Sequence, residues 1–362
     1  MGQAAIDDQI SEAETPVSKP DRSLRSLFSF FSKKGAKPAR KSGKTRPVVG
    51  FSTLGDGVSM VRVSNTGDKP VIEDMIYWPR TTTDSHSTIL YELVNQHPLA
   101  GANAFAVTEP GHCNLHLVEA PNVESEEMLS ALRWRIKELI DYDIEEAAID
   151  AFDIPGRNLR GSGGGMIYAV VTKKSSVLER IGFYQEAGVS LSVLDIPELA
   201  LRNIATLLPE EKDGVALIHL SKNSGMIVLC RDSVLYLARN IHVGSINLMR
   251  TISSSQDKDS NPMFANELSA EARNTYEGII IETQRSLDYY ERHSSNSPIK
   301  SVVISASDIV IPDEVLENLS SGLNLPVKKL ELNGLIDSNT PVDEKLQSQT
   351  LLALGVALRE AG

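Results

Sequence analysis

Short runs of apolar, β-branched residues recur at two places along the chain in the same layout. The later set lies at Val215 to Leu220, Met226 to Cys230 and Val234 to Ile241. The earlier set lies at Val48 to Ser52, Val58 to Val63 and Val71 to Trp78. Turn-forming residues such as Asn, Asp, Ser and Gly separate the runs within each set. The pattern predicts two three-stranded antiparallel meanders, so the chain contains the same unit twice.

Helical patterns alternate with further strands after each meander. In the first half, helices are predicted at Thr83 to Asn95, Ser175 to Ala187 and Pro197 to Leu207, with strands at Ala102 to Val107 and Ser190 to Leu194. In the second half, helices are predicted at Leu268 to His293, Pro312 to Ser320 and Asp343 to Glu360, with strands at Ser301 to Ser305 and Pro326 to Leu330. This alternation predicts an α/β sheet in each half. A hinge at Pro209 to Gly214 divides the first half, 47–208, from the second half, 209–362.

An extra block interrupts the first half at about residues 108–172. The pattern of Met128, Leu132, Ile136 and Leu139 predicts an amphipathic helix from Ser125 to Tyr142. Strands are expected around it at Asn114 to Glu119, Ala148 to Asp153 and Met166 to Thr172. The glycine run 161–165 lacks the Gly-Lys-Ser/Thr ending of a phosphate loop, so it is interpreted as a hairpin tip. Together these elements predict a small inserted subdomain.

Three local features have simple structural interpretations. Asp195 stands just before Pro197 and is expected to cap the helix that follows. Residues 251–262 are rich in Ser and Asp and are expected to form an irregular insertion. His112, Cys113 and His116 have the composition of a metal site, but in an extended segment Cys113 points away from the two histidines, so no metal site is predicted.

Composition places the chain among ordinary globular proteins. It has 362 residues, 41% of them hydrophobic, and only two cysteines, which is too few for a disulfide framework. No apolar run approaches the roughly 18 residues that a membrane-spanning helix needs. The first residues also lack the basic-then-apolar order of an export signal. We therefore expect a protein that stays inside the cell.

Charge is distributed unevenly. Ten Lys or Arg residues and one Asp lie between Lys19 and Arg46, a net charge of +9. The chain from Pro47 onward has 26 basic and 43 acidic residues, a net charge of −17. Residues 1–46 have no long periodic pattern and are expected to form a disordered basic arm. The body should repel nucleic acid and anionic lipid, whereas the arm should attract both.

One segment of this arm is both apolar and basic. Its apolar residues follow helical spacing and border two lysines; the predicted membrane-contact residues are Leu24, Leu27, Phe28, Phe31, Lys33 and Lys34. Two interpretations stay open: the segment lies on an anionic membrane surface, or it packs against its own domain. Nucleic acid is disfavoured as a partner, because the aromatic residues cluster instead of alternating with the basic ones.

A meander followed by helices is also how each half of an actin-like fold begins. In nucleotide-using members, the first turn of each half wraps a phosphate, and an Asp at the strand end orders magnesium. In this chain the strand of the second meander ends His219-Leu220-Ser221, with no carboxylate. The turn is present without its acid, which favours a binding protein over an enzyme.

Three segments resemble the PilM family of type IV pilus assembly. They are Glu186 to Arg202 (EAGVSLSVLDIPELALR), Arg285 to Tyr290 (RSLDYY) and Ala353 to Arg359 (ALGVALR). The resemblance covers roughly residues 47–362, and its strongest likeness is to the divergent branch that serves the mannose-sensitive haemagglutinin (MSHA) pilus. It implies duplicated RNase H-like halves with an inserted subdomain of the PilM and FtsA type.

The same resemblance implies a cytoplasmic role at the inner membrane. PilM-like proteins hold the cytoplasmic tail of a PilN-like bitopic membrane protein in a groove between the inserted subdomain and the core of the first half. Carried to this sequence, the groove lies between the strands near Val48 to Val63 and the inserted helix. The candidate contacts on that helix are Leu132, Trp134 and Ile136.

The nucleotide positions implied by the fold have changed in this chain. Ser52 and His219 stand where acids are expected, and the third turn, which contacts adenosine in the family, lacks its glycines. The degenerate nucleotide positions are Ser52, Gly55, Asp56, Gly57, His219, Ser221, Ser224, Gly225, Ser305, Ala306 and Ser307. We therefore expect a non-catalytic scaffold without a cofactor. The alternative is an ATPase or a sugar-kinase-type phosphotransferase that binds ATP and magnesium, with Asp56 replacing the missing acid.

Overall fold

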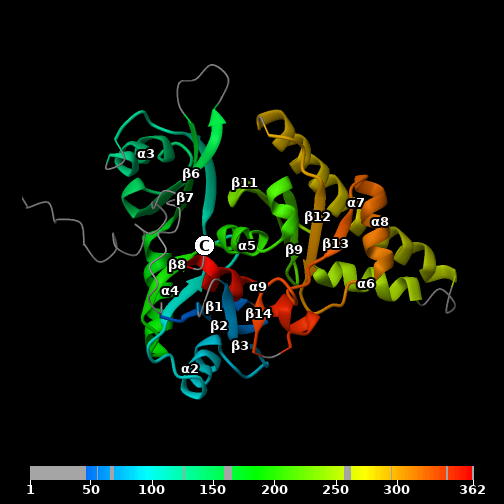
Figure 1. Ribbon diagram of the computed structural model, residues 1–362, viewed down its shortest axis with the longest axis horizontal. Helices are drawn as coiled ribbons and strands as arrows, with labels where there is room; N and C mark the ends of the chain where they lie inside the picture. Colours follow the sequence, from blue (N-terminus) through cyan, green and yellow to red (C-terminus); the bar gives the residue numbers. More distant parts are fainter. Residues whose placement is uncertain are drawn as a thin grey trace, which may run out of the picture.

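The computed structural model describes residues 46–54, 56–65, 69–124, 127–158, 165–256, 262–294, 296–339 and 341–360. Within these ranges the strands form three sheets (Figure 1). The predicted membrane-contact residues Leu24, Leu27, Phe28, Phe31, Lys33 and Lys34 lie outside the described residues, as does Gly55. None of the described helices has the length and apolar character needed to cross a membrane.

The first sheet has six strands in the order β14-β3-β2-β1-β4-β8. They are β1 (Val48–Leu54), β2 (Gly57–Asn65), β3 (Pro70–Pro79), β4 (Asn103–Val107), β8 (Leu191–Asp195) and β14 (Asp337–Ser338). The first three form an antiparallel meander, and β4 and β8 extend it in parallel. Val49 and Phe51 pack in one apolar cluster with residues of α2 (His86–Gln96) and α4 (Lys174–Glu186), whereas Val48 packs in another, because successive side chains on a strand point to opposite faces.

The second sheet repeats this plan in the order β11-β10-β9-β12-β13. Its strands are β9 (Val215–Leu220), β10 (Gly225–Arg231), β11 (Val234–Ile241), β12 (Ser301–Ala306) and β13 (Val327–Lys329). Its outer helices are α6 (Ser245–Gln256), α7 (Pro262–His293) and α8 (Asp313–Leu323). Ile218 and Ile304 pack towards α7 and α8, and Leu217 and Val303 face the other way.

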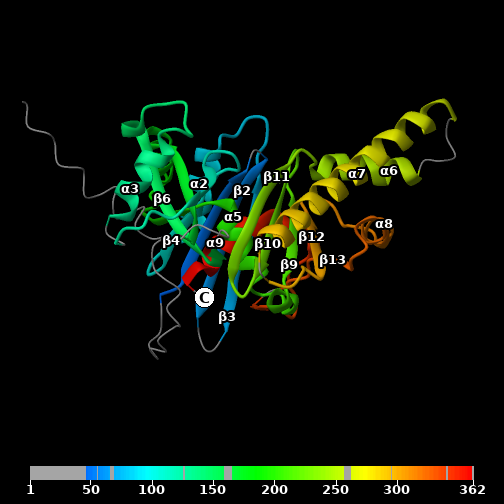
Figure 2. The ribbon, with the colours of Figure 1, turned by 90° about the horizontal axis from the view of Figure 1, so that it is seen from above.

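Two helices lie between the sheets, and each covers the sheet of the other half (Figure 2). The first half ends with α5 (Pro197–Ala205), which packs on β9, β10 and β11, and the chain ends with α9 (Glu344–Ala357), which packs on β1 to β4. Contact between α9 and β1 is close, since a Cβ at Gly50 would lie 2.0 Å from the Ala353 carbonyl oxygen. Short 3₁₀ turns at Ile144–Glu146, Pro209–Asp213 and Leu358–Glu360 complete the connections.

A third sheet, in the order β5-β7-β6, lies between β4 and β8 in the sequence. It contains β5 (Asn114–Glu119), β6 (Ala147–Asn158) and β7 (Gly165–Lys173), and α3 (Met128–Ile136) covers one face (Figure 1). Ile167, Ala169 and Val171 of β7 share an apolar cluster with α3. The intervening Tyr168 and Val170 pack against the cores of the two halves. These elements are called the inserted subdomain below.

Two sequence-based boundaries were wrong. The inserted helix is much shorter than Ser125 to Tyr142, because the chain turns after Ile136 and continues into the Ile144–Glu146 turn. The segment predicted as an irregular insertion is helical as far as Gln256, and α7 begins at Pro262. Local hydrogen bonds explain the second difference: the Asn247 side chain accepts from the Gly244 N–H, and Thr251 Oγ1 donates to the Asn247 carbonyl. These bonds hold the first turns of α6 despite its Ser-rich sequence.

Candidate functional site

The first of the two predicted phosphate turns is filled by the protein itself. Ser52 is buried near the end of β1. A Cβ at Gly57 would lie 2.5 Å from the Trp78 carbonyl oxygen and 2.7 Å from the Tyr77 ring. Because Gly57 has no side chain, β3 can pack directly against it. The space beside Gly57 is therefore occupied by β3 and is not open to a ligand.

The second turn is closed in a similar way by the start of α6. The backbone N–H of Ser245 donates to the Ser221 carbonyl at 2.8 Å, and that of Ile246 donates to the Lys222 carbonyl at 3.1 Å. A Cβ at Gly225 would meet the side chain of Leu220 at 2.6 Å. Ser224 is half-buried beside it.

His219 and the serines of the third turn are brought together at the ends of β9 and β12. Ser305 pairs with His219 in the parallel register, and Ala306 pairs with Leu220. His219, Ser305 and Ser307 are all buried, and their side-chain polar atoms have no hydrogen-bond partner among the described residues. Burial lowers the pKa of His219 to about 4, so the imidazole is neutral at pH 7.

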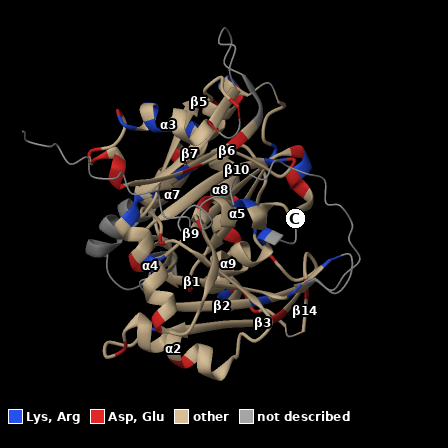
Figure 3. Ribbon diagram, turned by 90° about the vertical axis from the view of Figure 1, so that its left-hand side faces the viewer, with Lys and Arg blue, Asp and Glu red and all other residues tan. Residues whose placement is uncertain are grey.

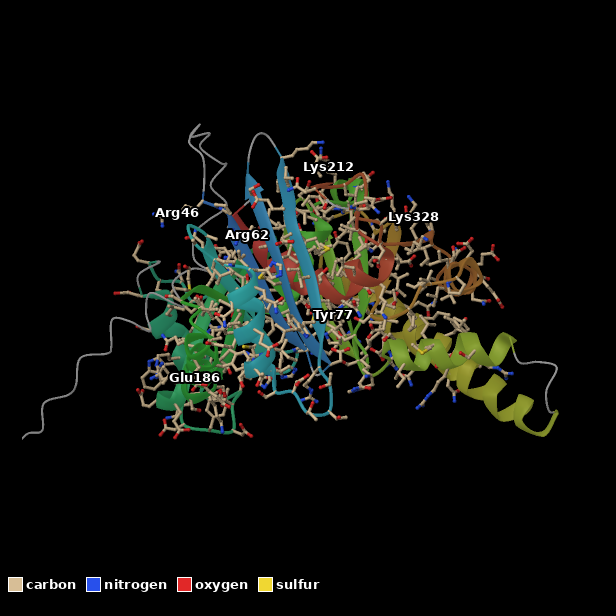
Figure 4. All side chains as sticks on the ribbon, turned by 90° about the horizontal axis from the view of Figure 1, so that it is seen from below. Arg46, Arg62, Tyr77, Glu186, Lys212 and Lys328 are labelled. Carbon is tan, nitrogen blue, oxygen red and sulfur yellow. The ribbon has the colours of Figure 1, made fainter. Side chains whose placement is uncertain are left out.

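A polar cluster joins the first turn to the third turn. The Tyr77 hydroxyl donates to the Asp56 carbonyl at 3.0 Å, and Ser59 Oγ donates to the Gln349 carbonyl at 2.7 Å. The Gln349 side chain donates to the Asp308 carboxylate. Burial and then the nearby Asp56 and Asp308 raise the pKa of Tyr77. Figure 4 shows Tyr77 where the first sheet approaches the second half.

Asp308 and Gln349 are members of this cluster that sequence reasoning missed. Asp308 adopts a left-handed backbone with φ 64°, which is uncommon for a residue with a side chain. An Asp that follows a serine-rich strand end was a usable signal, because Asp favours such turns. Gln349 gave no signal, since its role depends on where α9 crosses the first sheet. Among the described residues, no group of three His, Cys, Asp or Glu side chains could hold a metal ion.

A separate pocket of about 340 Å³ lies between the inserted subdomain and the core of the first half. Its lining comes from both sides: His112, Cys113, Val170 and Thr172 belong to the inserted subdomain and its entry loop, and Leu194 and Ile196 belong to the core at β8. Val177, Arg180 and Phe183 of α4 close the third side. The pocket therefore has an apolar floor with polar groups at its edge, and it is called the groove below.

Charged side chains at the edge hold the groove in shape. Arg180 donates to the Glu109 carboxylate at 2.9 Å and lies over the Phe183 ring at 5.5 Å. His112 Nδ1 is 3.8 Å from the second oxygen of Glu109. Thr172 Oγ1 donates to the His112 carbonyl at 2.7 Å, which ties the inserted subdomain to this edge. Burial raises the pKa of the Cys113 thiol to about 11, which favours the protonated thiol at neutral pH.

A buried carboxylate with a partly buried arginine lies beneath the groove floor, and this pair corrects the interpretation of Asp195. The N-cap of α5 is Ile196, and Asp195 is the last residue of β8. One carboxylate oxygen of Asp195 accepts from the Ile196 N–H at 2.8 Å, and the other accepts from Arg359 at 2.7 Å. The sequence could not reveal this partner, since 164 residues separate the two side chains.

Glu198 is a second buried acid at the same place, in the first turn of α5. Burial raises its pKa to about 7, a bond from its own backbone N–H opposes the shift, and the negative charge of Asp195 adds to it. It also lies close enough to Cys113 to influence the thiol. The groove floor thus lies above a carboxyl group that changes charge near neutral pH.

The predicted groove contacts on the inserted helix are not brought to this groove. Leu132 and Ile136 are fully buried in the core of the inserted subdomain, so their side chains cannot touch a partner. Trp134 is 78% exposed on α3, which covers the opposite face of the β5-β7-β6 sheet from the groove. Figure 3 shows basic residues along α3, and Arg133 and Arg135 pair with Glu145 and Glu119. The side chains of β7 alternate between the two faces of this sheet. Those on the face away from α3 form the wall that faces the core.

Two meander-led sheets with exchanged helices between them define an actin-like fold. A solved PilM–PilN type IV pilus biogenesis complex is similar to this chain with a TM-score of 0.65 and 17% identity, covering 88% of this chain and 100% of that chain. A Bacteroides thetaiotaomicron protein with an actin-like ATPase fold and unknown function has a TM-score of 0.45 and 9% identity, covering 86% and 96%. The cytoplasmic domain of EpsL from the Vibrio cholerae type II secretion system has a TM-score of 0.42 and 12% identity, covering 86% and 97%. No protein-family model and no curated protein sequence matches the chain.

Proposed function

We propose that this chain is a non-catalytic, actin-like scaffold of type IV pilus assembly that holds the cytoplasmic tail of a PilN-like inner-membrane protein. The observation that carries the proposal is the groove of about 340 Å³ between the inserted subdomain and the core. The similarity of the fold to the solved PilM–PilN complex supports the choice of partner. The sequence likeness to the MSHA branch favours an MSHA-type pilus and a role like that of the biogenesis protein MshI.

The groove has the chemistry of a peptide site. Its floor of Val170, Leu194 and Ile196 offers apolar surface for side chains of a tail. The edge offers hydrogen-bonding groups and a partly exposed ion pair, Glu109 with Arg180. Sites that bind peptides and small ligands combine such an apolar interior with a few placed polar groups. A scaffold with this site would be cytoplasmic and peripheral at the inner membrane.

A groove-filling substitution tests this placement. Ser176 is half-buried at the groove edge on α4, so we expect Ser176→Arg to fill the space and reduce recovery of the PilN-like protein at least tenfold. The measurement is a pull-down from detergent-solubilised native membranes with the full chain. Trp134→Glu, on the outer face of the inserted subdomain, is the matched comparison and should leave recovery unchanged. If Trp134→Glu reduces recovery of the PilN-like protein and Ser176→Arg does not, the tail binds at α3 and not in the groove.

The residues at the two predicted phosphate turns support the non-catalytic part of the proposal. A Mg²⁺–phosphate group needs carboxylates near the phosphate turns, but positions 52 and 219 hold a serine and a neutral histidine. The two turns are also packed by Tyr77 and by the start of α6. These residues do not fit the magnesium-bound nucleotide of an actin-like ATPase, and no chemical step is assigned to them.

The alternative, an ATPase or sugar-kinase-type phosphotransferase, has one observation in its favour. Asp56 and Asp308 both lie close enough to Tyr77 to raise its pKa, so two carboxyl groups share the cleft. Isothermal titration with Mg-ATP separates the two functions, and we expect no heat of binding. Micromolar binding that disappears in Asp56→Ala would favour the enzyme.

The basic arm is the proposed membrane contact. The net charge of +9 on residues 19–46 suits an anionic bilayer surface, and so do the apolar and basic residues Leu24, Leu27, Phe28, Phe31, Lys33 and Lys34. We expect the full chain to float with vesicles rich in anionic lipid at low salt, and flotation should fall several-fold at 0.5 M salt or when Lys33 and Lys34 are both changed to Glu. If that variant floats as well as the parent chain at low salt, the arm is not the membrane contact.

A further inference from the structure

A second cavity, of about 350 Å³, opens on the outer side of the second half. It lies between the C-terminal part of α7, the loop before β12 and the turn that leads from α8 to β13; α7 and α8 lie side by side (Figure 1). Buried Leu287, Ile299 and Leu323 form an apolar floor. This cavity shares no lining residue with the groove, and the proposed function does not use it.

The wall of this cavity is acidic. Asp288 and Glu291 are three residues apart on α7, so they stand on one face of the helix. Both are exposed, and no ion pair forms at either carboxylate within the described part of the chain. The cavity lining contains no Lys or Arg. It therefore offers two negative charges above an apolar floor.

The walls of the cavity are fixed from inside the protein. Buried Arg231 donates to the Ser297 carbonyl at 2.6 Å and to the Pro298 carbonyl at 3.2 Å, which holds the loop before β12. Its guanidinium also donates to the Tyr290 hydroxyl of α7 at 3.1 Å. Gln284 donates to the Gly322 carbonyl at 3.0 Å and joins α7 to the end of α8. A ligand would meet a cavity that is already formed, which lowers the entropic cost of binding.

The ligand that suits these walls combines large apolar side chains with positive charge. The chain itself contains such a segment in the arm, where Leu24, Leu27, Phe28 and Phe31 are followed by Lys33 and Lys34. The complementarity extends to the whole molecule, since residues 1–46 carry a net charge of +5 and the chain from Pro47 onward carries −17. Attraction of opposite charges would bring the arm to the body, and the apolar floor would hold it there.

The connection is long enough for this contact within one molecule. Arg46 lies 15 positions after Phe31, and an extended chain of that length spans up to about 50 Å. The 316 residues from Pro47 onward correspond to a radius of gyration of about 20 Å, and so to a body about 50 Å across.

We propose that the segment Leu24 to Lys34 docks into the cavity between α7 and α8 of its own molecule. Its apolar residues cover Leu287, Ile299 and Leu323, and its basic residues approach Asp288 and Glu291. The segment cannot occupy the cavity and an anionic membrane at the same time. Docking therefore keeps the apolar residues covered when no membrane is present.

Photo-crosslinking of the full chain tests this contact. Benzoylphenylalanine replaces Phe28, the protein is irradiated without lipid, and the attachment points are mapped by mass spectrometry. We expect crosslinks within one polypeptide to residues 284–299 or 323–325. The double variant Asp288→Lys with Glu291→Lys should lower their yield at least fivefold, because both carboxylates of the wall become cations.

A matched control separates the cavity from general charge attraction. Glu138→Lys with Asp141→Lys makes the same change in net charge, also three residues apart and exposed, on the inserted subdomain. This control should leave the yield unchanged, and both double variants should keep the thermal midpoint of the parent. Equal loss in the two variants, attachment points scattered over the body, or crosslinked dimers that grow with protein concentration would each overturn the proposal.

Discussion

Replacing Arg359 with methionine is expected to lower the free energy of unfolding by about 3–5 kcal/mol, because it leaves a buried carboxylate without its partner. Asp195 is 1% exposed, and Arg359 Nη1 is 2.7 Å from its Oδ2. Methionine keeps much of the length and volume of the arginine side chain but removes the charge. Urea unfolding followed by circular dichroism measures the effect.

The double variant Asp195→Asn with Arg359→Met is the control for this prediction. Asparagine can still accept the hydrogen bond from the Ile196 N–H, and neither charge of the pair remains. Removing both partners of a buried ion pair is often close to neutral, so most of the lost stability should return. If the single variant loses less than about 1 kcal/mol, the pair is not what holds the end of β8 against the last turn of the chain.

Replacing Glu198 with glutamine is expected to stabilise the protein at pH 8 by an amount on the order of 3 kcal/mol. The pKa of Glu198 is raised from its ordinary value near 4.5 to about 7 by burial, so the folded state favours the protonated acid. Between these two pH values the folded state binds more protons than the unfolded state, and stability falls as the pH rises. Above pH 7 the full cost of burying the carboxylate is present, and glutamine removes it.

The pH dependence of this gain is its distinguishing mark. Thermal midpoints of the parent and of Glu198→Gln should nearly coincide at pH 4.5 and separate by several degrees at pH 8. Glu179→Gln makes the same change in charge at an exposed position on the groove edge, and it should leave the midpoint unchanged at both pH values. A gain for Glu198→Gln that is equal at pH 4.5 and pH 8 would mean that packing is responsible, and not ionisation.

Both predictions concern the junction where three parts of the fold meet beneath the groove. Asp195 ends a strand of the first sheet, Glu198 begins the helix that packs on the second sheet, and Arg359 follows the helix that packs on the first. Cys113 belongs to the loop that enters the inserted subdomain. A change in the charge of Glu198 would alter the packing beneath the groove floor. The affinity of the groove for a tail should therefore be compared at pH 6 and pH 8.

The site shows clearly where sequence reasoning was insufficient. The apolar spacing of Leu132 and Ile136 correctly marks one face of a helix, but spacing does not say which surface that face covers. The structure places this face on the outer side of the β5-β7-β6 sheet. The groove is lined instead by residues such as Thr108, Cys113 and Val170, whose nearness depends on the pairing of β5 with β7 and on the docking of the inserted subdomain.

The sequence by itself determined the repeated meanders, the α/β character of both halves and the place of the inserted block. These follow from the alternation of apolar residues and from turn residues, which act over a few neighbours in the chain. Only the tertiary structure decided that α5 and α9 each pack on the sheet of the other half, that Gly50 admits the Ala353 carbonyl, and that Asp195 meets Arg359. The physical reason is that the contacts of α9, Gly50 and Asp195 join residues more than 100 positions apart. The geometry of all these contacts depends on how the sheets and helices pack together.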